Sequence, residues 1–230
     1  MKTFPVVEIF GPTIQGEGPL IGVPTMFVRF GGCDYRCSWC DTLYAVLPEE
    51  VRKNSTQMTV EQIVGSIDIG RRYCEWVTLS GGNPLLHDLE ELVDQLRKDG
   101  WRVAVETQGT VYHEWVQNTL LIVSPKPPSS GMSVDFKKLG RFMSHDSLTL
   151  KIVIFDDEDF EFAVQVRQKF PDPKIPLTLQ IGNHVGEDSL FSLTEKLRWL
   201  VKKVTSDERL FNVRVLPQLH VWLWGNSRGF

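Results

Sequence analysis

Short apolar runs alternate along the chain with longer stretches in which apolar residues recur at the period of an α-helix. Apolar, β-branched runs of about 4–8 residues bounded by turn residues are typical of buried strands. Seven such runs predict strands over residues 25–30, 76–80, 102–106, 120–124, 148–155, 176–181 and 211–216. Because helical patterns separate most of these strands, we expect β-α units around a mostly parallel sheet.

Start and stop signals predict four helices between the strands, beginning near Thr59, Asn83, Asp156 and Leu190. Thr59 is followed three residues later by Gln62, as in a capping box. The Asn83-Pro84 pair is a helix start signal, and the leucine-rich stretch that follows it ends at Gly100. Residues 121–144 are rich in proline and lack a period, which predicts a loop and one short helix.

Polar and glycine residues follow six of the predicted strands at their C-terminal ends. In order, they are Gly31-Gly32-Cys33, Ser80–Asn83, Glu106–Gly109, Ser124–Lys126, Gln180 with Asn183, and Pro217-Gln218. Parallel barrels and open α/β sheets build their active sites at this edge. Any single end is equally well explained as a polar turn, but the recurrence at six ends favours a shared functional rim.

The overall composition is that of an ordinary globular protein. The 230 residues suit one domain, 42% of them are hydrophobic and 23% are charged. With 25 Lys and Arg against 29 Asp and Glu, the net charge is −4, so we expect no binding to nucleic acid or to an anionic membrane surface. No apolar run approaches the roughly 18 residues of a membrane helix. The N-terminal residues lead directly into patterned sequence, so we expect no signal peptide and a cytoplasmic location.

Three of the four cysteines, Cys33, Cys37 and Cys40, crowd into a C-x3-C-x2-C segment after the first predicted strand. A structural zinc normally takes four ligands, and no nearby His or Cys supplies a fourth. A redox pair of Cys37 and Cys40 requires a thioredoxin-like helix start and leaves Cys33 without a role. A [4Fe-4S] cluster held by three thiolates leaves one iron open to an outside ligand. The spacing strongly favours this third interpretation.

This cysteine segment resembles the signature of the radical S-adenosylmethionine (SAM) superfamily. Trp39 stands where the superfamily usually carries an aromatic residue. Ser80–Pro84 resembles its glycine-rich segment, usually GGEP, which contacts the methionine amino group of SAM; here Asn83 replaces the usual Glu. Gly81-Gly82 alone would be interpreted as a tight turn. The resemblance implies an α/β radical SAM fold. Because 230 residues are few for a full eight-fold barrel, we expect an incomplete TIM-type barrel of about six βα units.

A closer resemblance, from residue 5 to the C-terminus, is to the 7-carboxy-7-deazaguanine synthase family, in its Gram-positive form. It is carried by Glu8–Gly18, Arg29, Cys33–Thr42, Glu106–Thr110 and Ser124–Lys126. The resemblance implies one radical SAM core domain over residues 1–230, with short N-terminal and C-terminal segments that cap the substrate. It also implies Mg²⁺, a homodimer and a flavodoxin-type electron donor. A partner subunit would cover edges that an incomplete barrel leaves open.

The implied reaction converts 6-carboxy-5,6,7,8-tetrahydropterin to 7-carboxy-7-deazaguanine and ammonia, in queuosine and 7-deazapurine biosynthesis. The cluster would cleave SAM to a 5′-deoxyadenosyl radical that abstracts hydrogen from C6 of the pterin, after which SAM is re-formed. Two alternatives remain. One is another small radical SAM enzyme, such as a glycyl-radical activase, which would share the cysteines but not Gln15–Gly18. The other is a non-catalytic zinc- or cluster-binding module.

The resemblance assigns residues to four groups. Cluster ligands are Cys33, Cys37 and Cys40, and Thr42 would bind Mg²⁺. SAM contacts are Trp39, Cys40, Asp41, Gly82, Glu106, Gln108, Ser124, Pro125 and Lys126. Substrate contacts are Ile14, Gln15, Gly16, Glu17, Arg29, Ser80, His220 and Phe230. No further residue is assigned as catalytic, and Cys74 is expected to be an inert thiol.

Arg29 is also singled out by its position in the predicted strand. It alternates with Met26 and Val28, so it is expected to point into the barrel while they face the helices. A buried guanidinium needs an anionic partner. The substrate carboxylate, held by two parallel hydrogen bonds, and an acidic side chain in a structural salt bridge are the two candidates.

Overall fold

The computed structural model describes residues 2–186 and 189–230. Within them, nine strands form a single sheet in the order β3-β1-β2-β4-β5-β6-β7-β8-β9. Their bounds are β1 Phe4–Ile14, β2 Pro24–Phe30, β3 Thr56–Met58, β4 Trp76–Gly81, β5 Arg102–Thr107, β6 Leu120–Val123, β7 Leu148–Ile154, β8 Leu177–Ile181 and β9 Arg214–Leu216.

All seven predicted strands are present, as β2 and β4 to β9, and each pairs in parallel with the next along the chain. Sequential parallel order is the arrangement of a TIM-type barrel. The described sheet runs from β3 at one edge to β9 at the other and does not close on itself. The predicted incomplete barrel is therefore confirmed.

Two strands are not predicted by the sequence pattern. β1 and β3 lie antiparallel to their neighbours and extend the sheet beyond β2. Gly11 and Pro12 interrupt β1, and its register with β2 shifts between Phe10 and Thr13. Glycine and proline argue against a strand interior, and a bulge is the means by which a sheet accommodates them.

The helices largely follow the predicted start signals. They are α1 Leu43–Val46, α2 Pro48–Asn54, α3 Val60–Ile67, α4 Glu90–Lys98, α5 Phe136–Gly140, α6 Asp157–Lys169, α7 Leu190–Thr205 and α8 Leu219–Trp224. Short 3₁₀ turns occur at Gly18–Leu20, Asp68–Arg72, Pro84–Leu86, Glu114–Asn118, Pro128–Ser130 and Glu208–Leu210. No described helix is both long enough and apolar enough to cross a membrane.

The capping residues confirm three helix starts and correct the fourth. Thr59 and Gln62 form the predicted capping box, and Asp156 and Ser189 cap α6 and α7. Asn83 caps only the 3₁₀ turn Pro84–Leu86, after which the backbone becomes extended and α4 starts afresh at Glu90. The prediction that α4 begins at Asn83 is therefore wrong.

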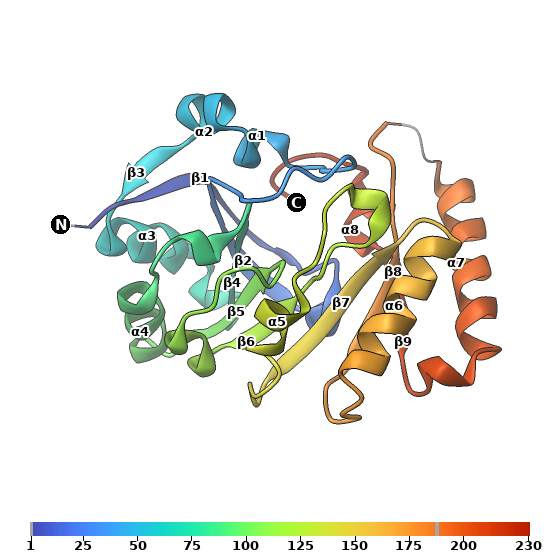
Figure 1. Ribbon diagram of the computed structural model, residues 1–230. Helices are drawn as coiled ribbons and strands as arrows, with labels where there is room; N and C mark the ends of the chain where they lie inside the picture. The colour runs from blue at the N-terminus through green and yellow to red at the C-terminus, as the bar shows by residue number, and fades with distance from the viewer. Residues whose placement is uncertain (1, 187–188) are drawn as a thin grey trace.

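The helices cover the outside of the curved sheet, with α3 and α4 toward β1 and α6 and α7 toward β9 (Figure 1). The outward strand positions, such as Met26 and Val28, are 1% and 0% exposed and belong to the core shared with the helices. Inward positions on the same strands are more polar, among them Arg29, Ser80 and Lys151. The predicted alternation about Arg29 is confirmed, and it directs polar groups into the barrel.

Candidate active site

A pocket lies at the C-terminal edge of the parallel strands, and all six predicted strand ends contribute to it. Each end supplies at least one lining side chain: Cys33, Ser80, Glu106, Ser124, Gln180 and Gln218. Every site residue predicted from the sequence lines this pocket except Pro125, which is not among its described lining residues. The structure thus brings together groups separated by more than two hundred positions in the sequence, from Ile14 to Phe230.

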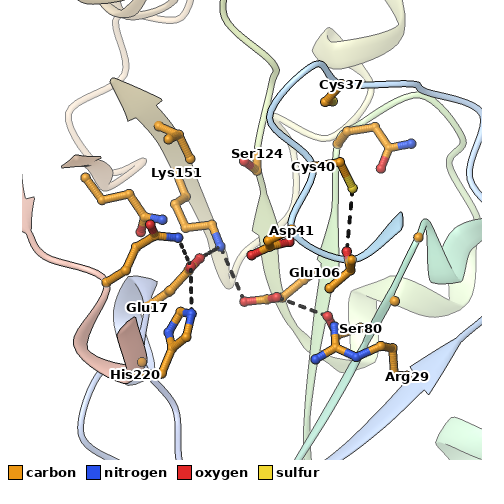
Figure 2. Close-up of a pocket in the computed structure, with 18 of the residues that line it drawn as sticks. Glu17, Arg29, Cys37, Cys40, Asp41, Ser80, Glu106, Ser124, Lys151 and His220 are labelled. Atoms are coloured by element: carbon orange, nitrogen blue, oxygen red, sulfur yellow. Dashed lines mark hydrogen bonds and ion pairs between the residues drawn. The ribbon is translucent and has the colours of Figure 1, made fainter. Parts of the chain in front are cut away.

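The three cysteines of the loop after β2 line one side of the pocket, where Cys37 and Cys40 face its interior (Figure 2). Burial raises the pKa of the Cys37 thiol to about 11 and also raises the pKa of Cys33. Metal ligation requires the thiolate form, so a metal centre bound here would displace the protons of these thiols. Cys74 lies outside this pocket lining, where its sulfur contacts the carbonyl of Gly70 at 3.6 Å.

The donor set suits a cluster better than a single ion. Among the described residues, no three His, Cys, Asp or Glu side chains converge closely enough to hold one metal ion. A mononuclear zinc site needs such convergence. In an iron–sulfur cluster each thiolate binds a different iron, so three cysteines around one pocket fit it without meeting at a point.

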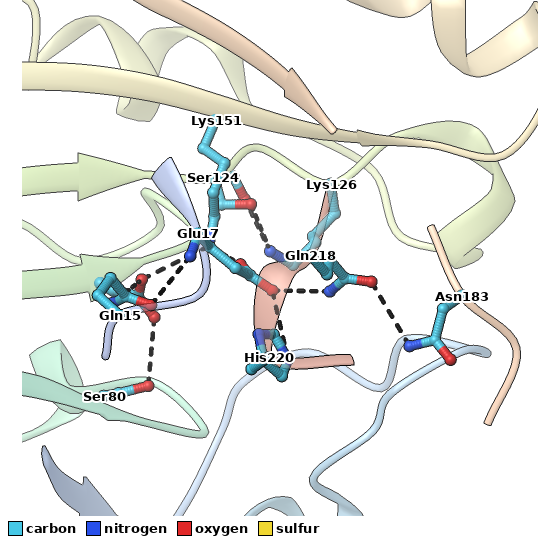
Figure 3. Close-up of polar contacts among 10 residues, drawn as sticks. Gln15, Glu17, Ser80, Ser124, Lys126, Lys151, Asn183, Gln218 and His220 are labelled. Carbon is cyan, nitrogen blue, oxygen red and sulfur yellow. Dashed lines mark hydrogen bonds and ion pairs between the residues drawn. The ribbon is translucent and has the colours of Figure 1, made fainter. Parts of the chain in front are cut away.

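Opposite the cysteines, Lys151 from β7 lies between two carboxylates (Figures 2 and 3). Its ammonium forms a short ion pair with Glu17 and lies 3.5 Å from Oε1 of Glu106. Burial alone would raise the pKa of Glu17, but Lys151 and His220 hold it well below the usual range. Burial alone would lower the pKa of Lys151, but Glu106 and Glu17 keep it above its usual value. The Glu17–Lys151 pair therefore stays ionised inside the pocket.

Further polar contacts link this charged group to the predicted substrate residues (Figure 3). Gln15 donates to Oε1 of Glu106 at 3.3 Å, and the hydroxyl of Ser80 lies 3.4 Å from Oε2. On the other side, Gln218 donates to Oε1 of Glu17 at 2.7 Å. Glu106, predicted as a SAM contact, thus shares one hydrogen-bonded network with two residues predicted to bind substrate.

Arg29 forms a salt bridge to Glu8 on the neighbouring strand. An acidic side chain was one of the two candidate partners considered for this arginine from the sequence. Its Nε donates to Oε1 of Glu8 at 2.6 Å, and the hydroxyl of Tyr44 donates to the same oxygen at 2.9 Å. Although burial alone would lower the pKa of Arg29, Tyr44 and Glu8 raise it. Within the described residues only Nε of Arg29 donates a hydrogen bond, so both Nη groups are available to an anion.

A third part of the pocket lies around the loop after β6. The ammonium of Lys126 donates to the carbonyl and the hydroxyl of Ser124, each at 2.9 Å. Trp39 donates from its indole to Ser129 at 3.0 Å and packs against Phe155 with ring centres 5.2 Å apart. These contacts tie the cysteine loop to the ends of β6 and β7.

The C-terminal segment reaches across to the N-terminal one. The amide of Leu219 donates to the carbonyl of Gly16 at 2.9 Å, and a Cβ on Gly16 would meet the His220 ring at 2.2 Å. Further along, the guanidinium of Arg228 lies 3.5 Å from the centre of the Tyr44 ring, which agrees with the C-terminus lying beside α1 (Figure 1). Phe230 lines the pocket although it is 52% exposed.

Several pocket residues received no individual role from the sequence, among them Lys151, and Gln180, which was named only as part of the polar rim. Gln180 is fully buried, and neither its Oε1 nor its Nε2 has a partner among the described residues. Buried amides almost always have partners, so this one is open to a ligand. A signal was present for Lys151, the one charged residue in the apolar strand Leu148–Ile154.

An incomplete parallel barrel whose first parallel strand runs into a three-cysteine loop defines a class, the radical SAM enzymes. Residues 27–119 match the model of that family, described as the Radical SAM superfamily. Membership of this superfamily implies a [4Fe-4S] cluster and SAM as cofactors.

The relatives identify the family within this class. The chain is 47% identical to the 7-carboxy-7-deazaguanine synthase of Bacillus subtilis (strain 168), with 99% of both chains covered. It is 42% identical to the enzyme of the same name from Bacillus cereus, over the full length of both. The chain belongs to the 7-carboxy-7-deazaguanine synthase family.

Solved structures agree with this placement. The crystal structure of QueE from Escherichia coli superimposes with a TM-score of 0.75 at 26% identity, covering 95% of each chain. SuiB from Streptococcus suis bound to S-adenosylmethionine has a TM-score of 0.57 at 13% identity, which shows a shared fold.

Proposed function

We propose that the chain catalyses the radical ring contraction of 6-carboxy-5,6,7,8-tetrahydropterin to 7-carboxy-7-deazaguanine, with release of ammonia, in queuosine-type 7-deazapurine biosynthesis. The observation that carries the proposal is the pocket itself. It joins the cysteine loop to ionised Glu17 and to Arg29, whose two Nη groups make no hydrogen bond within the described residues. A carboxylate and a polar ring edge on one small molecule complement these groups.

The cofactors take the side of the pocket that holds the cysteines. Cys33, Cys37 and Cys40 are proposed to hold the cluster, and SAM to lie against Trp39, Cys40, Asp41, Gly82, Glu106, Gln108, Ser124, Pro125 and Lys126. When bound, the cluster supplies the electron that cleaves SAM to a carbon radical. The protein's part is to hold the reacting atoms in place and exclude water.

The substrate is proposed to lie between the cysteine loop and Lys151. Arg29 binds its carboxylate, the Gln15 amide can donate and accept along the polar edge of the pterin, and the ionised Glu17 carboxylate accepts there. Ile14, Gly16, Ser80, His220 and Phe230 complete the proposed contacts. The buried ammonium of Lys151 keeps the carboxylate of Glu17 charged, so it can accept hydrogen bonds from ring N–H groups.

A Mg²⁺ ion is proposed at Thr42, whose hydroxyl lies 3.7 Å from the sulfur of Cys40 at the same pocket wall. One hydroxyl is a weak ligand, so substrate carboxylate oxygens and water would complete an octahedron. The ion would then be bound only together with substrate.

The remaining proposals concern the whole chain in the cell. Residues 1–230 are proposed to form one domain, of which Met1 and residues 187–188 lie outside the described structure. Its N-terminal and C-terminal segments cap the substrate, as the contact of Leu219 with Gly16 supports. We also propose a cytoplasmic homodimer reduced by a flavodoxin-type donor, without nucleic acid or membrane partners.

Anaerobic reconstitution tests this function. The expected result is about four irons per chain and SAM-dependent formation of 7-carboxy-7-deazaguanine from the carboxypterin. Protein that binds cluster and SAM but never turns over this pterin would support another radical SAM activity, such as that of a glycyl-radical activase. A colourless, zinc-loaded protein would support a non-catalytic module. Cys37→Ala should abolish cluster and turnover, whereas Cys74→Ala should spare both.

A further inference from the structure

The side chain of Asn83 is completely buried, and all of its hydrogen-bonding capacity is used. Its Nδ2 donates to Oδ1 of Asp34 at 3.0 Å and to the hydroxyl of Thr110 at 3.2 Å. Its Oδ1 accepts from the Thr107 hydroxyl at 2.9 Å and from the Leu85 amide at 3.3 Å. A buried amide with four satisfied bonds specifies both its identity and its orientation.

Through Asp34, this network reaches the cysteine loop. Asp34 follows Cys33 directly, and its Oδ1 also accepts a short hydrogen bond from Nε2 of Gln108, which lies 3.6 Å from the Cys33 sulfur. The backbone adds a parallel link, since the amide of Asn83 donates to the carbonyl of Gly32 at 2.8 Å. Three chain segments, the cysteine loop and the ends of β4 and β5, are thereby joined behind Cys33.

Asp34 and Asn83 do not line the described pocket, so they act behind the cofactor wall rather than on a ligand. Gly82 and Gln108, their neighbours, do line it. We propose that Asn83 and Asp34 are a positioning pair, whose hydrogen bond fixes the cysteine loop against the ends of β4 and β5. The pair thereby keeps the cluster and SAM in fixed positions relative to each other. The proposal rests on the loop carrying the cluster, as the proposed function requires.

The pair also explains why an amide replaces the carboxylate usual at position 83. A carboxylate there could accept from Thr107 and Leu85, but it would turn an oxygen instead of an N–H toward Asp34. The donor would be lost and two negative groups would face each other. Asparagine at position 83 therefore supplies the hydrogen-bond donor that aspartate at position 34 requires.

Exchanging the two residues tests the proposal. Asn83→Asp should load less iron and bind SAM about tenfold more weakly, as expected when one buried hydrogen bond is broken. It should also lose the change that SAM produces in the EPR spectrum of the reduced cluster. Asp34→Asn keeps an acceptor oxygen and should cost little. The double variant Asp34→Asn/Asn83→Asp turns an amide N–H at position 34 toward the carboxylate at position 83, and the Gln108 amide rotates so that its oxygen accepts from the amide at position 34. It should recover iron content, SAM affinity and the EPR change.

Asp94→Asn, a charge change on the exposed face of α4, is the matched control and should leave all three quantities unchanged. The proposal is overturned if Asn83→Asp behaves like the unmodified chain. It is also overturned if the double variant is no better than Asn83→Asp, because position 83 would then act without Asp34. None of these measurements uses the pterin. A chain that passes them but does not turn over the pterin would refute the proposed function and leave the positioning pair intact.

Discussion

Arg29 donates a hydrogen bond from Nε to Oε1 of Glu8 over 2.6 Å, and the two residues face each other across the β1–β2 pair. Glu8 thus occupies the Nε side of the guanidinium and leaves the edge formed by the two Nη groups for another anion. Such an orientation suits bidentate binding of a carboxylate. The structural salt bridge and the substrate contact are therefore compatible roles for one side chain.

Replacing Arg29 by lysine keeps the charge but removes the fork. We expect Arg29→Lys to raise the KM for the carboxypterin by about tenfold or more, because bidentate recognition is lost. The Kd for SAM should stay unchanged. Steady-state kinetics and SAM titration measure the two effects. Arg102→Lys, at an exposed ion pair with Glu75, is the control and should change neither. An unchanged KM in Arg29→Lys would rule out this contact.

Lys151 is the buried partner of two carboxylates, so removing its charge leaves them unpaired. Lys151→Met should lower the free energy of unfolding at neutral pH by about 3–5 kcal/mol. Urea denaturation of the apoprotein measures this loss. Lys53→Met removes the exposed partner of Glu50 and should have no measurable effect. Equal stability of both variants would show that the ion pairs of Lys151 contribute nothing to the free energy of unfolding.

The ion pairs of Lys151 also predict how the stability of the protein depends on pH. The folded state lowers the pKa of Glu17 from 4.5, so its stabilisation is present above pH 4.5 and is lost as the pH falls below it. The folded state raises the pKa of Lys151 from 10.5, so that stabilisation is present below pH 10.5 and is lost above it. Urea unfolding between pH 3 and pH 7 should show a shallower acid loss in Lys151→Met. If the free energy of unfolding falls equally steeply with acid in the unmodified chain and in Lys151→Met, the ion pair does not hold Glu17 ionised.

Gly16 touches the ring of His220 so closely that a methyl group would displace it. Gly16→Ala should therefore move His220 and the start of α8, and raise the KM for the pterin several-fold. Gly65→Ala is a matched control, because nothing lies within 4 Å of a Cβ placed there on α3. That variant should stabilise the helix by about 0.5–1 kcal/mol and leave KM unchanged. A Gly16→Ala enzyme with normal KM would exclude the capping role of the C-terminal segment.

The sequence predicted the parallel strands and the functional rim because both depend on local patterns. β4, for example, is an apolar run that ends in Ser80-Gly81-Gly82. The sequence pattern could not predict β1, because Gly11 and Pro12 interrupt its run of strand-forming residues and the strand is held by pairing with β2. The helix start at Asn83 was misplaced because the same side chain caps a 3₁₀ turn.

The contacts between distant residues were beyond local patterns. Glu8 becomes the partner of Arg29 only once β1 is placed beside β2, and Glu17 meets Lys151 only when the barrel forms. A lysine as the only charged residue of a buried strand was nevertheless a usable signal, since a buried ammonium requires an anionic partner. Asp34 carried no such signal, because an acidic residue in a loop is ordinarily solvated.

The fate of the hydrogen on C6 of the pterin tests the central claim most directly. A substrate carrying deuterium at C6 should be turned over anaerobically by the reconstituted chain, and the recovered SAM analysed by mass spectrometry. In the proposed reaction the radical takes this hydrogen and SAM is then re-formed, so the account predicts deuterium in SAM together with 7-carboxy-7-deazaguanine. Product formation with unlabelled SAM, or SAM cleavage without this product, would contradict it.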